Sequence, residues 1–242
     1  MSTRVDRLFS QPLAAGASFQ FDRDVADVFD NMANRSIPLY AATQDRTVSL
    51  LRHGVGQGGT IADVGCSTGE LFHRLIAAWP QCSCTLVGID ASAPMLEQAT
   101  AKVGSRATWL HTPVEEVDWA ALAPAAIVAN WTLQFVPPIG RVPLLAEMRR
   151  ASPPDGLLIL SEKLAPEPAL HDWVTRDYHA SKMAAGYTEE EIQNKARALD
   201  GVLIPWTLQQ WMDALRHSGW GTPTLLSAWA PFATLVCRPA HP

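Results

Sequence analysis

The stretch Asp63-Val64-Gly65-Cys66-Ser67-Thr68-Gly69 decides the fold of this chain. It closes a short apolar run, 60–64, with the composition of a buried strand, and it opens a helical pattern over 69–79. Glycines in such a loop let the backbone approach a ligand closely, and the following helix start offers free N–H groups. The stretch therefore predicts a strand–loop–helix unit that binds a ligand where the strand ends.

A second apolar run, 85–90, ends in Asp90. An acid at the end of the second strand of such a unit can accept hydrogen bonds from both hydroxyls of a ribose. Each feature has an ordinary structural explanation alone, a glycine turn and a solvated aspartate. Together they predict a nucleoside cofactor. The glycine spacing is not the G-x-G-x-x-G of dinucleotide enzymes.

Further along the chain, strand-like apolar runs alternate with helical patterns. The runs lie at 107–110, 126–130 and 157–161. Alternation of this kind predicts a parallel sheet covered by helices on both faces. Two last strands, within 223–236 and around Ala230-Pro231, are predicted to be antiparallel because their connection is short. The fold class expected is α/β, a seven-stranded, mostly parallel, Rossmann-like sheet with a terminal antiparallel hairpin.

The whole chain, 1–242, is expected to form a single domain. Its predicted parts are N-terminal cap helices at 20–54, a cofactor-binding core at 60–165, a helical lid for dimerisation and substrate at 166–218, and the terminal hairpin at 222–238. Asp22 is the predicted N-cap of the first helix. Residues 1–20 are expected to be loosely structured.

The composition excludes several classes of protein. Hydrophobic residues make up 48% of the chain, charged residues 18%, and the formal net charge is −5, which argues against a nucleic-acid or anionic-membrane binder. The apolar runs fall short of the ~20 residues of a membrane span, and no secretion signal is recognised. A cytoplasmic protein with reduced cysteines and no metal site is expected.

The form D-x-G-C-x-x-G resembles the first motif of class I S-adenosyl-L-methionine (SAM)-dependent methyltransferases, and the terminal hairpin fits that fold. This resemblance implies SAM as cofactor. It implies that Asp63 lies near the methionine amino group and that Asp90 holds the ribose.

Longer segments resemble the carboxy-S-adenosyl-L-methionine synthase family, in order and almost from end to end. They are residues 21–29 (FDRDVADVF), 35–40 (RSIPLY), 65–69 (GCSTG), 130–135 (NWTLQF), 160–163 (LSEK) and 186–192 (GYTEEEI). The resemblance implies a homodimer that converts SAM and prephenate to carboxy-SAM and phenylpyruvate for modification of the tRNA wobble uridine. The chain is a divergent member by this comparison.

The resemblance also implies a set of site residues. Tyr40, Gly65, Ser67, Asp90 and Asn130 match cofactor-contacting positions; Asp63, Cys66, Gly69 and Ala91 lie in the same two loops, and Pro113 and Val114 at the adenine position. Candidate catalytic residues are Tyr40 and, in the lid, Tyr178, His179 and Tyr187. The other lid and tail aromatics are expected mostly in the core or a dimer interface, with an acceptor pocket for an apolar or planar substrate as the alternative for some of them; they are Trp173, Trp206, Trp211, Trp220 and Trp229.

Two positions depart from the family. Pro113 replaces an acidic residue near the adenine, and Ala196 stands where the family has an arginine that reaches across the dimer to the transferred carboxylate. Losing such an anchor costs roughly 2–5 kcal/mol. Arg35, Arg176 and Arg197 are possible replacements.

Three functions remain open. The missing arginine favours a SAM-dependent methyltransferase acting on a small molecule. The full-length resemblance favours a carboxy-SAM synthase that holds its carboxylate by another route. A non-catalytic SAM-binding protein is the third. No direct nucleic-acid or membrane partner is expected.

Overall fold

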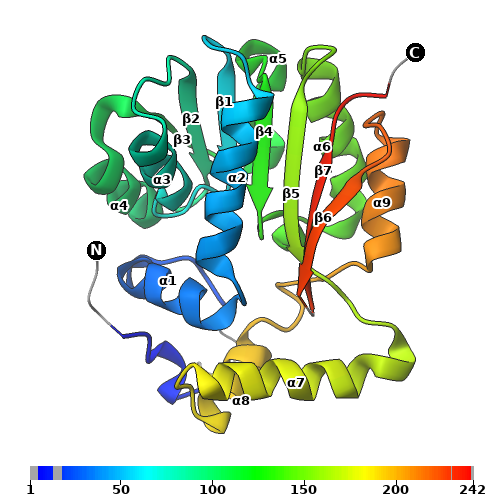
Figure 1. Cartoon of the computed structure of the whole chain (residues 1–242). Coiled ribbons are helices and arrows are strands. Elements are labelled where there is room, and N and C mark those ends of the chain that lie inside the picture. The colour runs from blue at the N-terminus through cyan, green and yellow to red at the C-terminus, as the bar shows by residue number, and fades with distance from the viewer. Residues whose placement is uncertain (1–4, 13–17, 230, 241–242) are drawn as a thin grey trace.

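The computed structural model describes residues 5–12, 18–229 and 231–240. The described chain forms a seven-stranded sheet in the order β3-β2-β1-β4-β5-β7-β6 (Figure 1). Strands β1 to β5 are parallel, whereas β7 runs antiparallel to β5 and β6 antiparallel to β7. The predicted fold class is confirmed. The strands are β1 (Thr60–Val64), β2 (Thr85–Asp90), β3 (Thr108–His111), β4 (Ala126–Asn130), β5 (Leu157–Lys163), β6 (Thr224–Trp229) and β7 (Phe232–Cys237).

Helices cover both faces of the sheet, as the buried central strands require. Val48 of α2 and Phe72 of α3 pack with Ile61 and Val128 on one face. On the other, α6 and α9 pack against residues that alternate with these along the same strands. The α-helices are α1 (Arg23–Ser36), α2 (Tyr40–Gly54), α3 (Glu70–Ala78), α4 (Ala93–Val103), α5 (Trp119–Leu122), α6 (Pro138–Ala151), α7 (His171–Ala184), α8 (Glu189–Ala198) and α9 (Leu208–His217). The 3-10 turns are η1 (Leu8–Ser10), η2 (Gly104–Arg106), η3 (Val114–Glu116), η4 (Leu133–Phe135) and η5 (Pro168–Leu170).

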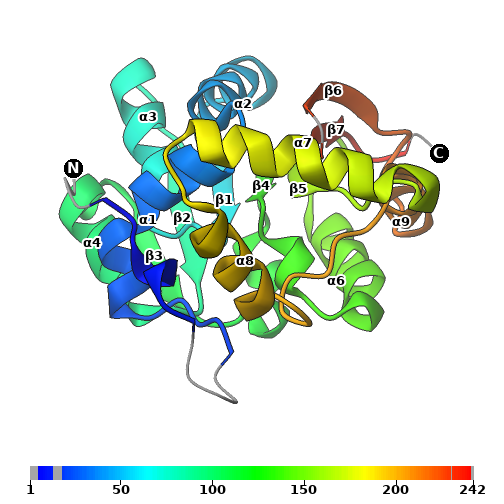
Figure 2. The ribbon, with the colours of Figure 1, turned by 90° about the horizontal axis from the view of Figure 1, so that it is seen from below.

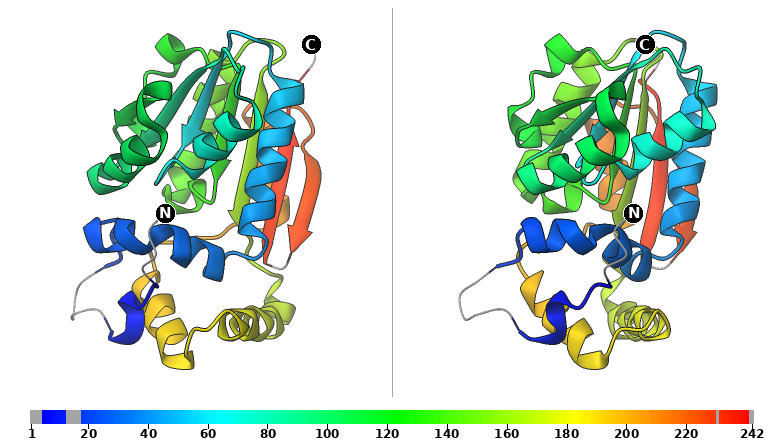
Figure 3. Two further views of the ribbon diagram at one scale, coloured as in Figure 1. Left: turned by 60° about the vertical axis from the view of Figure 1, so that its left-hand side comes forward. Right: turned by 90° about the vertical axis from the view of Figure 1, so that its left-hand side faces the viewer.

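Of the predicted cap and lid helices, α1, α7 and α8 lie at the end of the sheet where the parallel strands finish, whereas α2 and α9 pack on its faces. Figure 3 shows α1 between this end and the pair α7 and α8, and Figure 2 shows α7 and α8 crossing it from below. Asp22 is the N-cap of α1, as predicted, because its side chain accepts a hydrogen bond from the Val25 N–H. Helix α8 begins at a capping box formed by Thr188 and Glu191.

The prediction that residues 1–20 are loosely structured is wrong for the described part of that segment. Phe9 and Phe19 are buried in one cluster with α1, and the Asp6 side chain is 1% exposed. The Phe9 carbonyl accepts a hydrogen bond from the Asn194 side chain of α8. These partners are far apart in sequence, so no local periodicity could reveal the packing.

Strand β5 is longer than the predicted run 157–161, and the extension brings two ionisable residues to the sheet edge. Glu162 and Lys163 pair with Ala233 and Phe232 of β7. Because antiparallel pairing with β7 supplies partners for their backbone groups, the strand continues through these charged residues.

Candidate active site

The loop after β1 adopts a backbone shape that requires glycine. Gly65 has a φ of +63°, and a Cβ built on it would lie 2.2 Å from Oγ1 of Thr132. Ser67 and Gly69 also have positive φ values, of 53° and 74°, and Gly69 is the N-cap of α3. The loop is thus pressed against the loop that follows β4, and no larger residue fits at Gly65.

Asp90 joins the loops that follow β1 and β2. Its Oδ2 accepts a hydrogen bond from the Ser67 N–H at 2.8 Å, and its Oδ1 accepts one from the Ser92 N–H at 2.9 Å. Burial raises the pKa of Asp90, while these two amides and His111 oppose the rise. Asp90, the residue predicted to bind the ribose, therefore lies beside Ser67, and two backbone N–H groups fix its carboxylate.

Asp63, at the end of β1, is 4% exposed, and no hydrogen bond to its carboxyl group is recorded in the described part of the chain. Burial, followed by the Asp90 carboxylate, raises the pKa of Asp63 well above its ordinary value. A buried carboxyl group without a partner is costly. A ligand ammonium group would relieve that cost, and the methionine end of SAM carries one.

Asn130 ends β4 and provides the clearest sign of an absent ligand. Its side-chain oxygen and nitrogen are both buried and have no hydrogen-bond partner among the described residues. Leaving such groups unpaired costs about 1–3 kcal/mol each. A ligand that both donates and accepts hydrogen bonds here satisfies them, so Asn130 fits a cofactor-binding role.

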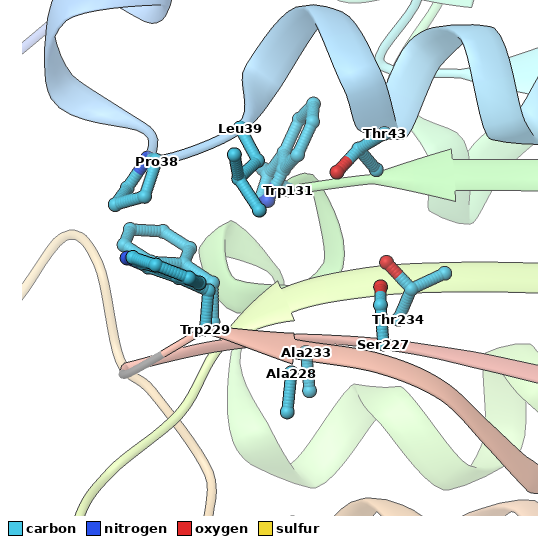
Figure 4. Close-up of a pocket in the computed structure, with 10 residues that line it drawn as sticks. Pro38, Leu39, Thr43, Trp131, Ser227, Ala228, Trp229, Ala233 and Thr234 are labelled. Carbon is cyan, nitrogen blue, oxygen red and sulfur yellow. The ribbon is translucent and has the colours of Figure 1, made fainter.

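Tyr40 and Trp131 form an aromatic wall next to Asn130. Their ring centroids are 5.1 Å apart, and both residues belong to a buried cluster with Phe232. Burial raises the pKa of the Tyr40 hydroxyl, so this residue stays protonated and is a poor acid. Figure 4 shows a neighbouring cavity between Leu39 and the strand carrying Trp229; its volume of about 30 Å³ admits a water molecule and not a cofactor.

An aromatic strap crosses the same edge of the sheet. Phe21 contacts Phe135 at 5.2 Å between ring centroids and Phe19 at 4.9 Å, and its carbonyl accepts a hydrogen bond from the Ser92 hydroxyl. The strap links the end of β2 with η4. No sequence pattern singled out Phe21 as part of the site. The sequence signal for this packing was its position directly before the Asp22 N-cap, where an apolar residue commonly packs against the first turns of the helix.

Buried Glu162 positions the loop that follows Asn130. Its carboxylate oxygens accept hydrogen bonds from the backbone N–H groups of Leu133 and Gln134 at 2.8 and 3.2 Å. Burial raises the pKa of Glu162 to about 8, against the opposing effects of these amides and Arg141. Sequence reasoning did not identify this residue as a support of the site.

The remaining predicted cofactor residues lie around the first three strands. The Cys66 side chain is buried and its N–H donates to the Ile89 carbonyl, while the Ala91 carbonyl lies 3.0 Å from the His111 imidazole Nε2. Val114 packs into the core, whereas Pro113 is exposed at the start of η3. The two residues predicted near the adenine therefore have different surroundings.

The predicted lid residues divide into two groups. The Tyr178 hydroxyl donates to the Ser36 carbonyl, and its ring lies 5.5 Å from Phe232 in the cluster that holds Tyr40 and Trp131. His179 follows it and is partly exposed; burial and the nearby Lys182 and Lys163 lower its pKa. The Tyr187 hydroxyl instead donates to Asp6, beneath the Arg35 guanidinium, and holds the N-terminal segment against the lid.

Ala196 is exposed on the outer face of α8. The three arginines considered as replacements for the arginine that the family has at this position make other contacts. Arg35 donates to the Ala185 and Asp6 carbonyls, Arg176 to the Asp172 carbonyl, and Arg197 to the Asn194 side chain.

The strand order, the glycine loop and the acid at the end of β2 define a class I SAM-dependent methyltransferase fold. Solved structures of that fold are similar to the chain. The magnesium protoporphyrin IX methyltransferase from Synechocystis, with bound SAH, has a TM-score of 0.57 at 17% identity, covering 82% of this chain and 83% of that one. A TehB-like SAM-dependent methyltransferase from Corynebacterium glutamicum has a TM-score of 0.55 at 16% identity, covering 87% and 97%.

Sequence relatives make the assignment narrower. The methyltransferase domain family matches residues 61–156. Carboxy-S-adenosyl-L-methionine synthase from Wolinella succinogenes is 36% identical over 96% of this chain and 98% of its own, and that from Pseudomonas putida is 36% identical over 99% and 100%. The chain belongs to the carboxy-S-adenosyl-L-methionine synthase family. It is thus a SAM-dependent transferase, and the buried carboxyl group of Asp63 and the unpaired side-chain amide of Asn130 fit SAM as its cofactor.

Within the described residues, no helix combines the length and apolar character needed to cross a bilayer.

Proposed function

We propose that this chain transfers the methyl group of SAM to a nitrogen, oxygen or carbon nucleophile of a small molecule. The observation that carries the proposal is Ala196. Its methyl side chain stands where the family resemblance calls for the guanidinium that binds the transferred carboxylate, while the cofactor-binding residues are retained. None of the three candidate arginines takes over that place, because each is engaged elsewhere.

SAM supplies an electrophilic methyl group. The chain's part is to bind and position: Asp63 and Asn130 hold the methionine end, Asp90 holds the ribose, and Tyr40 with Trp131 forms one wall. Positioning of this kind can supply much of the rate of a bimolecular transfer. His179, whose lowered pKa keeps its imidazole neutral at pH 7, is the residue of the lid best suited to accept a proton from the nucleophile.

A second candidate, carboxy-SAM synthase, is favoured by the full-length similarity to relatives bearing that name. The product named there is a carboxylated cofactor, and because residue 196 is alanine, this chain would need a cation elsewhere to bind its carboxylate.

One experiment separates the two. Protein purified natively is incubated with SAM and prephenate, and the bound and released nucleosides are identified by mass spectrometry. The methyltransferase proposal expects unreacted SAM, and S-adenosylhomocysteine only when an acceptor is present. Carboxy-SAM formed together with phenylpyruvate would instead establish the synthase.

We also propose that the functional form is a homodimer. Position 196 faces outward on α8, so a side chain there reaches a site only in a second copy. Light scattering after size exclusion tests this, and a monomer at assay concentration would contradict it.

A further inference from the structure

Three of the four lysines of the chain gather between the lid and the sheet edge. They are Lys163 at the end of β5, Lys182 near the end of α7 and Lys195 in α8. The ammonium groups of Lys163 and Lys182 lie 4.9 and 4.4 Å from the centroid of the same ring, that of Tyr178. Lys195 donates a hydrogen bond to the Ser36 hydroxyl at 3.0 Å. We call these three residues the lysine cluster.

The lysine cluster is short of negative charge. Lys182 and Lys195 are only 7% and 8% exposed, yet none of the ion pairs recorded in the described part of the chain includes any of the three lysines. Lysines are rarely buried unless paired, because burying an unpaired charge is costly. The Tyr178 ring, which lies close to the Lys163 and Lys182 ammonium groups, compensates part of this cost through cation–π contacts.

The cost is visible in the acid–base properties of the cluster. Burial, with Lys195 and Lys163 adding to it, lowers the pKa of Lys182 to about 7. Burial also lowers the pKa of Lys195 to about 8, although Asp6 opposes that change. The Asp6 carboxylate accepts a hydrogen bond from the Tyr187 hydroxyl, and its opposing effect on the pKa is the smallest of the causes at Lys182 but the second largest at Lys195. Lys163 and Lys182 are thus the members whose charge is least compensated by acidic groups of the chain.

The cluster adjoins the cofactor site. Asn130 pairs with Ser161 across β4 and β5, and Lys163 lies two residues beyond Ser161. Strand residues two positions apart share a face of the sheet, so Asn130 and Lys163 lie on the same face at the same edge. Tyr178, which contacts both ammonium groups, belongs to the buried cluster that contains Tyr40 and Trp131.

We infer that Lys163 and Lys182 form a carboxylate-binding subsite, with the Tyr178 ring as its apolar floor, that holds the acceptor substrate. The substrate class is therefore a small carboxylic acid with a planar or apolar body. This inference rests on the proposed function, because the subsite is assigned to the acceptor of the methyl transfer. The Lys163 and Lys182 subsite provides the positive charge that the side chain of Ala196 does not.

The test uses benzoate as the carboxylate probe, titrated calorimetrically into the full chain saturated with S-adenosylhomocysteine. Lys163→Met and Lys182→Met remove each charge at similar volume, and Arg176→Met removes an exposed charge from the same helix, α7, as a matched control. Loss of a charge-assisted contact corresponds to about tenfold or more in affinity for each lysine variant, against less than about twofold for the control. Replacing a buried unpaired lysine by methionine is expected to leave the fold intact or stabilise it.

The wild-type chain offers an independent readout. Benzoate binding should weaken as pH rises through about 7, because Lys182 then loses the proton that attracts the anion; its pKa is about 7. The other charged groups around it are Lys163, Lys195, Arg35, His179, Glu189 and Asp6. No benzoate binding at pH 6, or equal binding by the Lys182→Met and Arg176→Met variants, would overturn the subsite. Tighter binding of inorganic phosphate than of benzoate would also overturn it, in favour of a phosphate ester.

Failure of the subsite and failure of the proposed function give different results. Benzoate binding needs no turnover, so binding of the anion together with formation of carboxy-SAM would refute the proposed methyl transfer and leave an anion-binding site without a methyl acceptor. Methyl transfer to a neutral acceptor without benzoate binding would support the proposed function and refute the subsite.

Discussion

The site at the carboxyl ends of β1 and β2 differs from the site at the carboxyl ends of β4 and β5. At the first, Asp90 accepts hydrogen bonds from two backbone amides and the glycine loop is packed tightly against Thr132. At the second, the Asn130 amide and the Lys163 and Lys182 ammonium groups have no hydrogen-bond partners recorded in the part of the chain that the structure describes. Asp90 and the glycine loop are thus held by contacts within the free protein, while Asn130 and the two lysines have polar groups that a ligand can pair with. A substitution at Gly65 or Asp90 should affect folding and binding together, and one at Asn130, Lys163 or Lys182 should affect binding alone.

The largest effect is expected from Gly65→Ala. The added Cβ would be 2.2 Å from the Thr132 hydroxyl at a φ of +63°, so the loop has to move. The loss of SAM affinity should exceed about a hundredfold, equivalent to about 3 kcal/mol, and thermal unfolding should occur at a lower temperature. Calorimetry with S-adenosylhomocysteine and a melting curve check both.

Gly58→Ala is the matched control, because Gly58 also has a positive φ, +81°, but a Cβ there meets nothing within 4 Å. It should cost only the strain of the left-handed backbone, roughly 1–2 kcal/mol, and leave the cofactor affinity unchanged. Equal loss of affinity in the two variants would show that the contact with Thr132 is unimportant.

Asn130→Ala should separate binding from stability. Its amide has no partner in the free protein, so removing it should not lower the melting temperature. Losing the hydrogen bonds to the cofactor should weaken SAM binding by about 30-fold, that is, about 2 kcal/mol. Asp90→Ala should reduce both quantities, because the Ser67 and Ser92 amides lose their acceptor. A clear destabilisation by Asn130→Ala would contradict the contrast between the two sites.

Glu162→Gln should change how stability depends on pH. The pKa of Glu162 is raised to about 8 in the folded protein, from an ordinary value of 4.5, so the folded state favours the protonated form. Its contribution to stability is therefore full at low pH and is lost as pH rises towards 8. Glutamine does not ionise, so the melting temperature of the variant relative to wild type should increase between pH 5 and about 8. Parallel melting curves over this range would show instead that the carboxylate is ionised throughout.

The smallest effect is expected from Ala196→Arg. In the proposed homodimer the new guanidinium reaches the second copy, and it should strengthen binding of carboxy-SAM by about fivefold, near 1 kcal/mol, without changing the affinity for SAM. Glu190→Arg places the same charge on another exposed face of α8 and should have no effect. A similar gain from both variants would indicate general electrostatic attraction.

The sheet was predictable from the sequence because its signals are local. The runs that became β1, β2 and β4 are short, apolar and bounded by polar residues or glycine, and their predicted limits match the observed ones. Asp22 was recognisable as a cap for the same reason. The lid segments that form α7 and α8 were predictable only as helical, since these helices carry polar faces that do not reveal what they cover.

The lysine cluster and the N-terminal packing depend on contacts between distant segments. Lys195 bonds Ser36, and Tyr187 bonds Asp6, across separations of 159 and 181 residues. No pattern within a single helix or strand encodes such pairs. Val114 shows a further limit: the family resemblance placed it at the adenine position, and the structure packs its side chain into the core.

The pairing of Asp6 and Phe9 with the lid has a consequence for how the molecule assembles. Asp6 is bound by Tyr187, and Phe9 by Asn194 on α8. Contacts with such long loops between them are entropically expensive to close and tend to form late. Asp6 and Phe9 are synthesised long before α8 and cannot dock on it until α8 has been made. Their docking is therefore expected to be a late step in folding.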